Sequence, residues 1–243
     1  MISDIILGKK GSGKSYYIVF HYIVPALKKG LNVFSNMDFG FSESPHLSFC
    51  AASRFSEYLK IDVRKIFHSV DDDEIRRLVT IPAKCPSAFR VPFTSLIVID
   101  EIQSIFPARL SHKTEQGVHD FFSYHRHDAV DVVATSQSPK LLDYQLADLF
   151  NNVIKIQNLG KFGLGRRSYR IRWYGAINAF EHDSEKTARY DLSIFKLYRS
   201  CADFSQQDEV RFPIFLKFFI IGIAILLGLK LFLPGKALFT FFK

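Results

Sequence analysis

The chain has 243 residues, of which 48% are hydrophobic and 23% charged, so it can bury a packed core and is not a disordered protein. Its three cysteines (Cys50, Cys85 and Cys201) are widely spaced and form no CxxC pair, which argues against a zinc ribbon or a disulfide framework and fits a reducing compartment. The net charge is +8, but residues 211–243 hold five Lys or Arg and no acid, which leaves +3 for residues 1–210 and favours a membrane surface over a DNA-binding body.

The N-terminus lacks the features of a secretory signal peptide. Met1–Asp4 carries no positively charged side chain, and the apolar run Ile5–Leu7 is too short for a signal sequence. We therefore expect residues 1–205 to form one cytosolic domain.

The first predicted strand, Asp4–Leu7, leads directly into a phosphate-binding motif. Gly8–Ser15 reads GKKGSGKS and matches G-x-x-x-x-G-K-[ST] in full, and a helix is predicted over Ser15–Lys29. Glycines let the backbone wrap a phosphate, while the amide groups of the loop and the helix N-terminus point at it. A glycine-rich turn without a ligand is the alternative, and the order strand, loop, helix disfavours it.

This motif predicts ATP and Mg²⁺ as ligands. Lys14 is expected to reach the β- and γ-phosphates, and the Ser15 hydroxyl is expected to ligate Mg²⁺. The predicted nucleotide contacts are Gly8, Gly11, Ser12, Gly13, Lys14, Ser15 and Tyr16.

The next stretch contains a predicted strand at Leu31–Phe34 and a predicted helix around Ser53–Ile66. The acidic run Asp71–Glu74 precedes two arginines. We interpret it as a solvated helix N-terminus rather than a metal site, because acidic residues stabilise the first turn of a helix.

An acidic pair follows a buried strand at Leu96–Ile99. Asp100 and Glu101 would emerge at the carboxyl end of that strand, where open α/β sheets bind their ligands. We expect Asp100 to hold Mg²⁺ through water and Glu101 to orient or deprotonate the attacking water. A capping acid pair on an ordinary strand is the alternative.

Two further apolar strands are predicted at Val130–Ala134 and Val153–Ile156. Gln137, just beyond the first, could bond the γ-phosphate or the attacking water, or it could simply cap a helix. Buried strands that alternate with helical stretches indicate an α/β fold, a P-loop NTPase core whose mainly parallel sheet is flanked by helices.

A basic and aromatic cluster follows. Basic residues interleaved with aromatics suit single-stranded nucleic acid, but a solvent-facing strand edge protected by charge is an equal alternative, and contact with the tails of partner proteins or with anionic lipid is another. The cluster comprises Arg166, Arg167, Arg170, Arg172, Tyr169, Trp173 and Tyr174.

The C-terminal segment predicts one transmembrane helix. Ile214–Leu233 is twenty residues long with two charges near its ends, enough to span about 30 Å of hydrocarbon. With the flanking Pro213 and Pro234 this gives a helix over residues 213–234 and a short far-side tail over 235–243. An interfacial amphipathic helix is the alternative, although no polar stripe is visible.

Together these motifs resemble the zonular occludens toxin (Zot) family of inner-membrane assembly ATPases of filamentous bacteriophages. The resemblance covers residues 3–200 in order. It rests on Gly8–Ser15, Asn32–Asp38 with Asn36, Leu96–Glu101, His125–His127 before a strand that ends at Gln137, Tyr190-Asp191 and Tyr198–Ser200.

The resemblance implies an NTPase core of the additional-strand type and a cytosolic body with a single inner-membrane span. It also implies action as an oligomeric ring that extrudes single-stranded DNA while coat proteins are added. The family usually has a sizeable periplasmic region that contacts an exit channel, whereas only residues 235–243 follow the predicted span here. Little sequence therefore remains to carry a toxin activity.

Two sets of side chains stay open. An arginine from a neighbouring subunit could complete the site, with Arg109 and Arg126 as candidates. His119, His125 and His127 are interpreted as surface or inter-subunit residues rather than zinc ligands.

Three functions compete. The first is a membrane-anchored ATPase motor for phage assembly and extrusion. The second is a nucleotide-gated membrane scaffold that recruits coat and channel proteins with little turnover. The third is a secreted effector, against which the missing signal peptide and the short far-side tail both argue.

Overall fold

A computed structural model describes residues 1–39, 47–81, 91–160, 168–177, 179 and 181–198. Its centre is one sheet of eight strands in the order β3-β2-β4-β5-β1-β6-β7-β8. The first six strands in that order pair in parallel, and β7 and β8 extend the sheet in antiparallel fashion. The predicted mainly parallel α/β architecture is confirmed. The strands are β1 (Ser3–Leu7), β2 (Asn32–Ser35), β3 (Phe67–Ser69), β4 (Ser95–Ile99), β5 (Asp131–Ser136), β6 (Asn152–Asn158), β7 (Ser168–Tyr174) and β8 (Ser184–Arg189).

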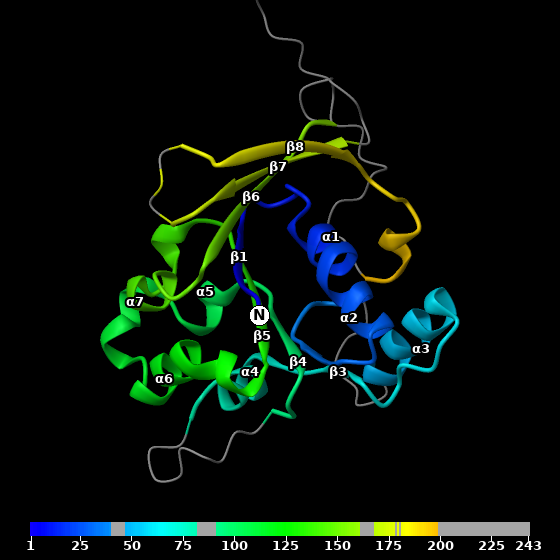
Figure 1. The fold of residues 1–243 in the computed structure, drawn as a ribbon, viewed down its shortest axis with the longest axis horizontal. Coiled ribbons are helices and arrows are strands. Elements are labelled where there is room, and N and C mark those ends of the chain that lie inside the picture. Colours follow the sequence, from blue (N-terminus) through cyan, green and yellow to red (C-terminus); the bar gives the residue numbers. More distant parts are fainter. Residues whose placement is uncertain (40–46, 82–90, 161–167, 178, 180, 199–243) are drawn as a thin grey trace, which may run out of the picture.

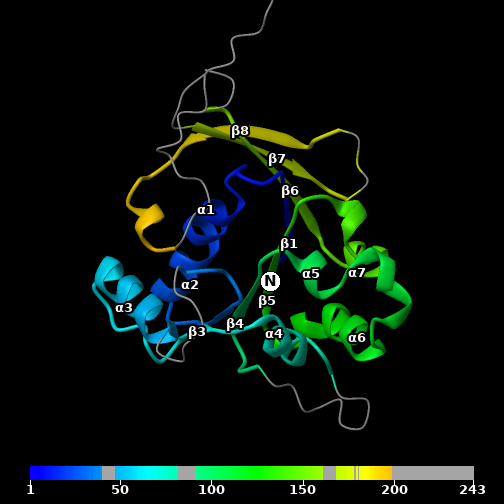
Figure 2. The same ribbon diagram turned by 180° about the vertical axis from the view of Figure 1, so that it is seen from behind.

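Helices cover both faces of the parallel part. On one face lie α1 (Lys14–Ile18), the π-helical turn η1 (Val19–Ile23), α2 (Val24–Lys28) and α3 (Leu47–Leu59); on the other lie α4 (Asp72–Leu78), α5 (Ile102–Ile105), α6 (Gln116–Tyr124) and α7 (Tyr144–Ala147) (Figures 1 and 2). The 3₁₀ turns are η2 (Ala108–Lys113), η3 (His125–Asp128), η4 (Pro139–Leu141) and η6 (Ile194–Lys196).

The strand residues alternate between two hydrophobic cores. In β1, Ile6 faces the core under α1–α3, whereas Ile5 and Leu7 face the core under α4–α7, and all three are almost fully buried. Burial on both faces is why the parallel strands have continuous apolar sequences.

The order of the strands determines which strand ends lie together at the edge of the sheet that carries the candidate site. β5 lies between β1 and β4, so the strand of the phosphate loop and the strand of the acidic pair are not neighbours, as the additional-strand type requires. Because β1, β2, β4 and β5 are parallel, the residues that follow them meet at one edge: Gly8, Asn36, Asp100 and Gln137.

Two predicted helices differ in detail. The predicted helix over Ser15–Lys29 contains the π turn η1, which immediately precedes the segment with Pro25. Proline has no N–H and its ring crowds the carbonyl four residues earlier, so a locally wider turn accommodates it. The helix predicted over Ser53–Ile66 is wrong in its second half: α3 ends at Leu59, and Lys60 adopts a left-handed φ of 58° that stops the helix.

The acidic run Asp71–Glu74 begins a helix, as predicted. The Asp71 side chain caps α4 by accepting a hydrogen bond from the Glu74 backbone N–H at 2.7 Å. Within the described residues no helix combines the length and apolarity that a membrane crossing requires. The predicted transmembrane helix over 213–234 and the tail over 235–243 lie outside the described residues.

Candidate nucleotide site

The phosphate loop folds tightly back on the end of β1. The Gly8 N–H donates to the Ser136 carbonyl at 3.2 Å, and the Ser12 N–H donates to the Lys9 carbonyl at 3.0 Å. A Cβ at Gly8 would lie 2.4 Å from the Ser12 hydroxyl and 2.8 Å from the Ile156 carbonyl, so only glycine fits.

The loop geometry suits a bound phosphate. Gly11 and Gly13 have φ values of 73° and 98°, and Gly13 is the N-cap of α1. The helix leaves the N–H groups of its first turn without helical acceptors, which makes Lys14, Ser15 and Tyr16 available as backbone donors. The buried Ser12 hydroxyl has no hydrogen-bond partner among the described residues.

Tyr16 can contact a bound nucleotide only through its backbone. Its side chain is 1% exposed and packs in an aromatic cluster with Tyr169, Tyr190 and Phe195. The predicted contact between Tyr16 and the nucleotide is therefore limited to the N–H group.

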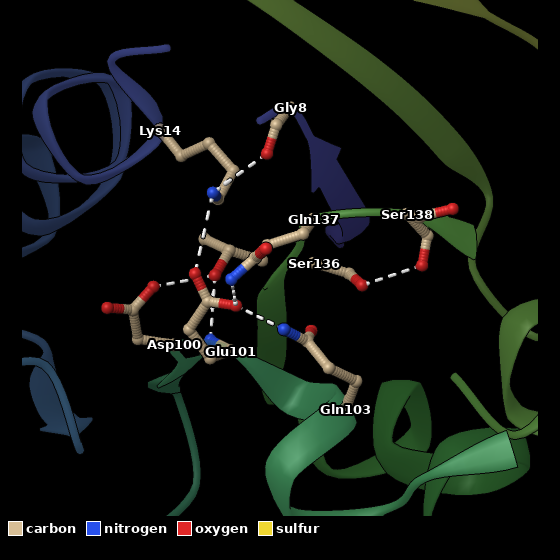
Figure 3. Close-up of polar contacts among 9 residues, drawn as sticks. Gly8, Lys14, Asp100, Glu101, Gln103, Ser136, Gln137 and Ser138 are labelled. Carbon is tan, nitrogen blue, oxygen red and sulfur yellow. Dashed lines mark hydrogen bonds and ion pairs between the residues drawn. The ribbon is translucent and has the colours of Figure 1, made fainter. Parts of the chain in front are cut away.

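Lys14 links the loop to the acidic pair. Its ammonium donates to the Gly8 carbonyl at 2.9 Å and lies 3.5 Å from Glu101 Oε1, with the lysine 6% exposed (Figure 3). The structure thus brings the predicted lysine and the predicted general base into contact, although one strand, β5, separates β1 from β4.

Three donors hold the Glu101 carboxylate. Besides Lys14 at Oε1, the side-chain amides of Gln103 and Gln137 both donate to Oε2, the latter at 3.2 Å (Figure 3). Gln137 therefore bonds the predicted base rather than capping a helix. Gln103 was not predicted, because its position inside a short helix carries no motif.

The backbone at Glu101 is bent so that this side chain points toward the loop. Glu101 has φ 49° and ψ 51°, an uncommon conformation for a residue other than glycine. Its N–H donates to the Thr135 hydroxyl at 2.8 Å, and that hydroxyl donates to Asp100 Oδ1 at 2.6 Å. Thr135 on the intervening strand therefore holds both acidic residues.

Asn36 fixes Asp100 from the other side. The Asp100 N–H donates to Asn36 Oδ1 at 2.7 Å, and Asn36 Nδ2 donates to the Asp100 carbonyl at 3.1 Å and to Asp72 Oδ1 at 2.6 Å. Burial raises the pKa of the Asp100 carboxyl and the neighbouring Glu101 charge raises it further, while the Thr135 hydrogen bond and Lys14 oppose the shift.

The residues present fit Mg²⁺ and a nucleoside triphosphate. Ser15 on the first turn of α1 and Asp100 at the end of β4 are the oxygen donors expected to hold the metal directly and through water. The glycine cradle, the unpartnered Ser12 hydroxyl and Lys14 are the observations that support a phosphate there.

Part of the basic and aromatic cluster lies on β7, where Arg170 and Arg172 both pair with Glu185 on β8, at 3.1 and 2.6 Å. Because β7 lies between β6 and β8, it is not the strand edge of the alternative interpretation. Tyr169 and Tyr174 are buried, so their rings do not offer an exposed surface for stacking. Arg166 and Arg167 lie outside the described residues.

The two candidate arginines lie in different surroundings. Arg109 is exposed on η2, a segment joined through the Pro107–Leu142 bridge to the chain that follows Gln137. Arg126 donates to the Asn151 side chain, and the Asn151 N–H bonds the Ser3 carbonyl at the start of β1, opposite the phosphate-loop edge.

The histidines do not all lie at the surface. His125 is fully buried, with Nδ1 2.6 Å from the Val130 carbonyl and its ring stacked on Phe121. Burial lowers the pKa of His125. The surface interpretation is therefore wrong for His125, which closes the turn before β5, while His127 is exposed.

Replacement of Thr135 tests the link between the two acids. Thr135→Val keeps the shape but leaves the Glu101 N–H and an Asp100 oxygen without this partner, so the free energy of unfolding should fall by about 1–3 kcal/mol in urea titrations. Thr135→Ser retains the hydroxyl and should lose less, about 0.8 kcal/mol for the methyl group. Equal losses in both variants would contradict the assigned role.

Comparison with known proteins places this site in a family. The family model for zonular occludens toxin (Zot) matches residues 2–204. The Gene 1 protein of Xanthomonas phage phiLf is 25% identical over 208 residues, which cover 84% of this chain and 45% of that protein. The chain therefore spans less than half the length of this relative.

One solved structure supports the same fold, and a second is reported as a further match. The N-terminal domain of zonular occludens toxin from Neisseria meningitidis superposes with a TM-score of 0.51 at 18% identity, covering 82% of this chain and all of that one. The DNA-packaging ATPase B204 from Sulfolobus turreted icosahedral virus matches with a TM-score of 0.48 at 20% identity, over 77% of this chain and 97% of that one. With the family model matching residues 2–204, the chain belongs to the zonular occludens toxin (Zot) family.

Proposed function

We propose that this protein is a membrane-anchored ATPase motor that drives the assembly and extrusion of filamentous phage, single-stranded DNA with its coat proteins, through the host inner membrane. The observation that carries the proposal is the contact between the phosphate-loop lysine and the acidic pair, Lys14 to Glu101 at 3.5 Å, at the carboxyl edge of the sheet. Family membership and the phage origin of the Gene 1 relative support the biological setting.

ATP is the proposed substrate, and its phosphates would lie on the loop between Gly8 and Ser15. The Lys14 ammonium has three donor hydrogens, and Gly8 and Glu101 are two acceptors for them. Phosphate oxygens would be a further acceptor or would replace Glu101, because both are anionic. Lys14 thus positions the phosphates, and Glu101 orients or deprotonates water beside them.

Mg²⁺, when bound, would neutralise charge that develops on the phosphate oxygens. Ser15 and Asp100 are the residues proposed to hold it. Burial raises the pKa of Asp100 because it disfavours the charged carboxylate, and a bound cation would offset that cost.

The setting of the motor is also a proposal. We place the body in the host cytoplasm and the single span at residues 213–234 in the inner membrane, because that segment is apolar and charge-poor. The proposed partners are phage coat proteins, exit-channel proteins and single-stranded DNA, with the subunits arranged as a homo-oligomeric ring.

A nucleotide-gated scaffold with little turnover is the second candidate. It is favoured by one feature of the site: Lys14, Gln103 and Gln137 hold both oxygens of Glu101, so the proposed base already has three partners. In that function ATP binding would displace Glu101 and organise partners without rapid hydrolysis.

Glu101→Gln separates the two functions. The variant keeps the shape of the side chain but removes the base, so MgATP binding should persist while turnover falls about 10²–10⁴-fold. For the motor, virion release should fall with turnover; for the scaffold, release should stay near normal. Glu115→Gln, the same change at an exposed position before α6, is the matched control.

The proposed ring of subunits predicts that Arg109 acts on the nucleotide bound by a neighbouring subunit. Arg109→Ala should lower turnover by about 10³-fold or more if it stabilises phosphate charge in a neighbouring subunit. Arg126→Ala should leave turnover nearly unchanged, because Arg126 bonds Asn151 at the opposite sheet edge.

ATP turnover by a mixture of two inactive variants tests whether Arg109 acts on a neighbouring subunit. Subunits with Arg109→Ala and subunits with Lys14→Ala should recover turnover when co-assembled, since some interfaces then combine an intact loop with an intact arginine. No recovery, or a normal rate for Arg109→Ala alone, would contradict the assignment.

A further inference from the structure

The segment after β8 packs directly on the phosphate loop. Tyr190 is the first residue after this strand and is 7% exposed. A Cβ placed on Gly13 would lie 2.5 Å from the Tyr190 hydroxyl and 3.4 Å from two of its ring carbons. The three heavy atoms nearest to that position all belong to Tyr190, so its ring fills the space that a side chain at Gly13 would need.

A second contact joins the same segment to the first turn of α1. The Asp191 N–H donates to the Tyr16 hydroxyl at 2.7 Å. The Tyr16 ring packs edge-on against Tyr190 at 4.8 Å between centroids and against Phe195 at 5.0 Å. Gly13 and Tyr16 therefore both contact this segment.

Residues 190–198, here named the strap, are anchored along their length. Ile194 and Leu197 are almost fully buried in the core under α1–α3. The Lys196 carbonyl accepts a hydrogen bond from Arg54 on α3 at 3.4 Å. The strap lies beside α1 in both views (Figures 1 and 2). In the sequence it precedes residues 213–234, the predicted span.

We propose that Tyr190 is a positioning residue of the phosphate loop, which the strap holds against Gly13. The inference rests on the proposed function and adds a residue that sets the nucleotide affinity of the same site. The backbone at Gly13 and Lys14 determines the position of the Lys14 ammonium. Displacement of the Tyr190 ring would let this backbone move, and phosphate binding would weaken.

Full-length protein in lipid nanodiscs tests this with three variants. Tyr190→Leu removes the ring, Tyr190→Phe keeps it, and Phe55→Leu is the matched control. Phe55 on α3 is fully buried in the same core, where its ring packs against Phe39 and Phe67. The readouts are the Kd for a fluorescent ATP analogue with Mg²⁺, and hydrogen exchange of the amides of residues 8–18 without nucleotide.

Tyr190→Leu should raise the Kd by about tenfold and speed exchange in the loop, whereas Tyr190→Phe should restore both toward wild type. Phe55→Leu should lower the unfolding midpoint comparably but leave the Kd and loop exchange near wild type. Equal Kd changes in both leucine variants, or loop exchange unaltered by Tyr190→Leu, would overturn the inference. If wild-type protein binds no nucleotide, the proposed function fails, and the exchange measurement still decides whether Tyr190 positions the loop.

Discussion

The site is organised around the Lys14 ammonium, which bridges the Gly8 carbonyl and the Glu101 carboxylate. This contact joins the ends of β1 and β4, two strands that are not neighbours in the sheet. The intervening β5 supplies the remaining connections, because Thr135 bonds both acidic residues and Gln137 bonds Glu101. A buried cation requires such partners, since an unpaired charge away from water is costly.

The backbone conformation around this contact is tightly constrained. Gly8 has no space for a side chain, Gly13 meets the Tyr190 ring, and Glu101 adopts a left-handed conformation. Strained or close-packed backbone of this kind persists where surrounding structure holds it in place. Here the Thr135 hydroxyl holds the Glu101 N–H, and the Tyr190 ring of the strap packs against Gly13.

Features of the fold that depend on short sequence patterns could be predicted from the sequence. The loop motif, the apolar strands before Gly8 and Asp100, and the acidic cap of α4 are all signals within a few residues. The α/β fold follows from their alternation, and the placement of Lys14 near Glu101 follows from parallel strands sharing an edge.

Partnerships across the fold could not be predicted in this way. Asn36 and Asp100 are 64 residues apart, and Thr135 is 35 residues from Asp100, so only the sheet order reveals that they bond. β8 was not expected because its sequence, SEKTAR, is exposed on both faces and carries no apolar alternation. Tyr16 lies next to the motif residues, yet its ring turns into the core, which the motif alone does not indicate.

Steady-state ATP hydrolysis by the full-length protein in lipid nanodiscs with Mg²⁺ tests the central claim most directly. Lys14→Ala is the blank, and Lys28→Ala, an exposed lysine at the end of α2, controls for loss of a positive charge. The account predicts turnover in the wild type and in Lys28→Ala that disappears in Lys14→Ala. Equal rates in all three proteins, or no nucleotide binding by the wild type, would contradict it.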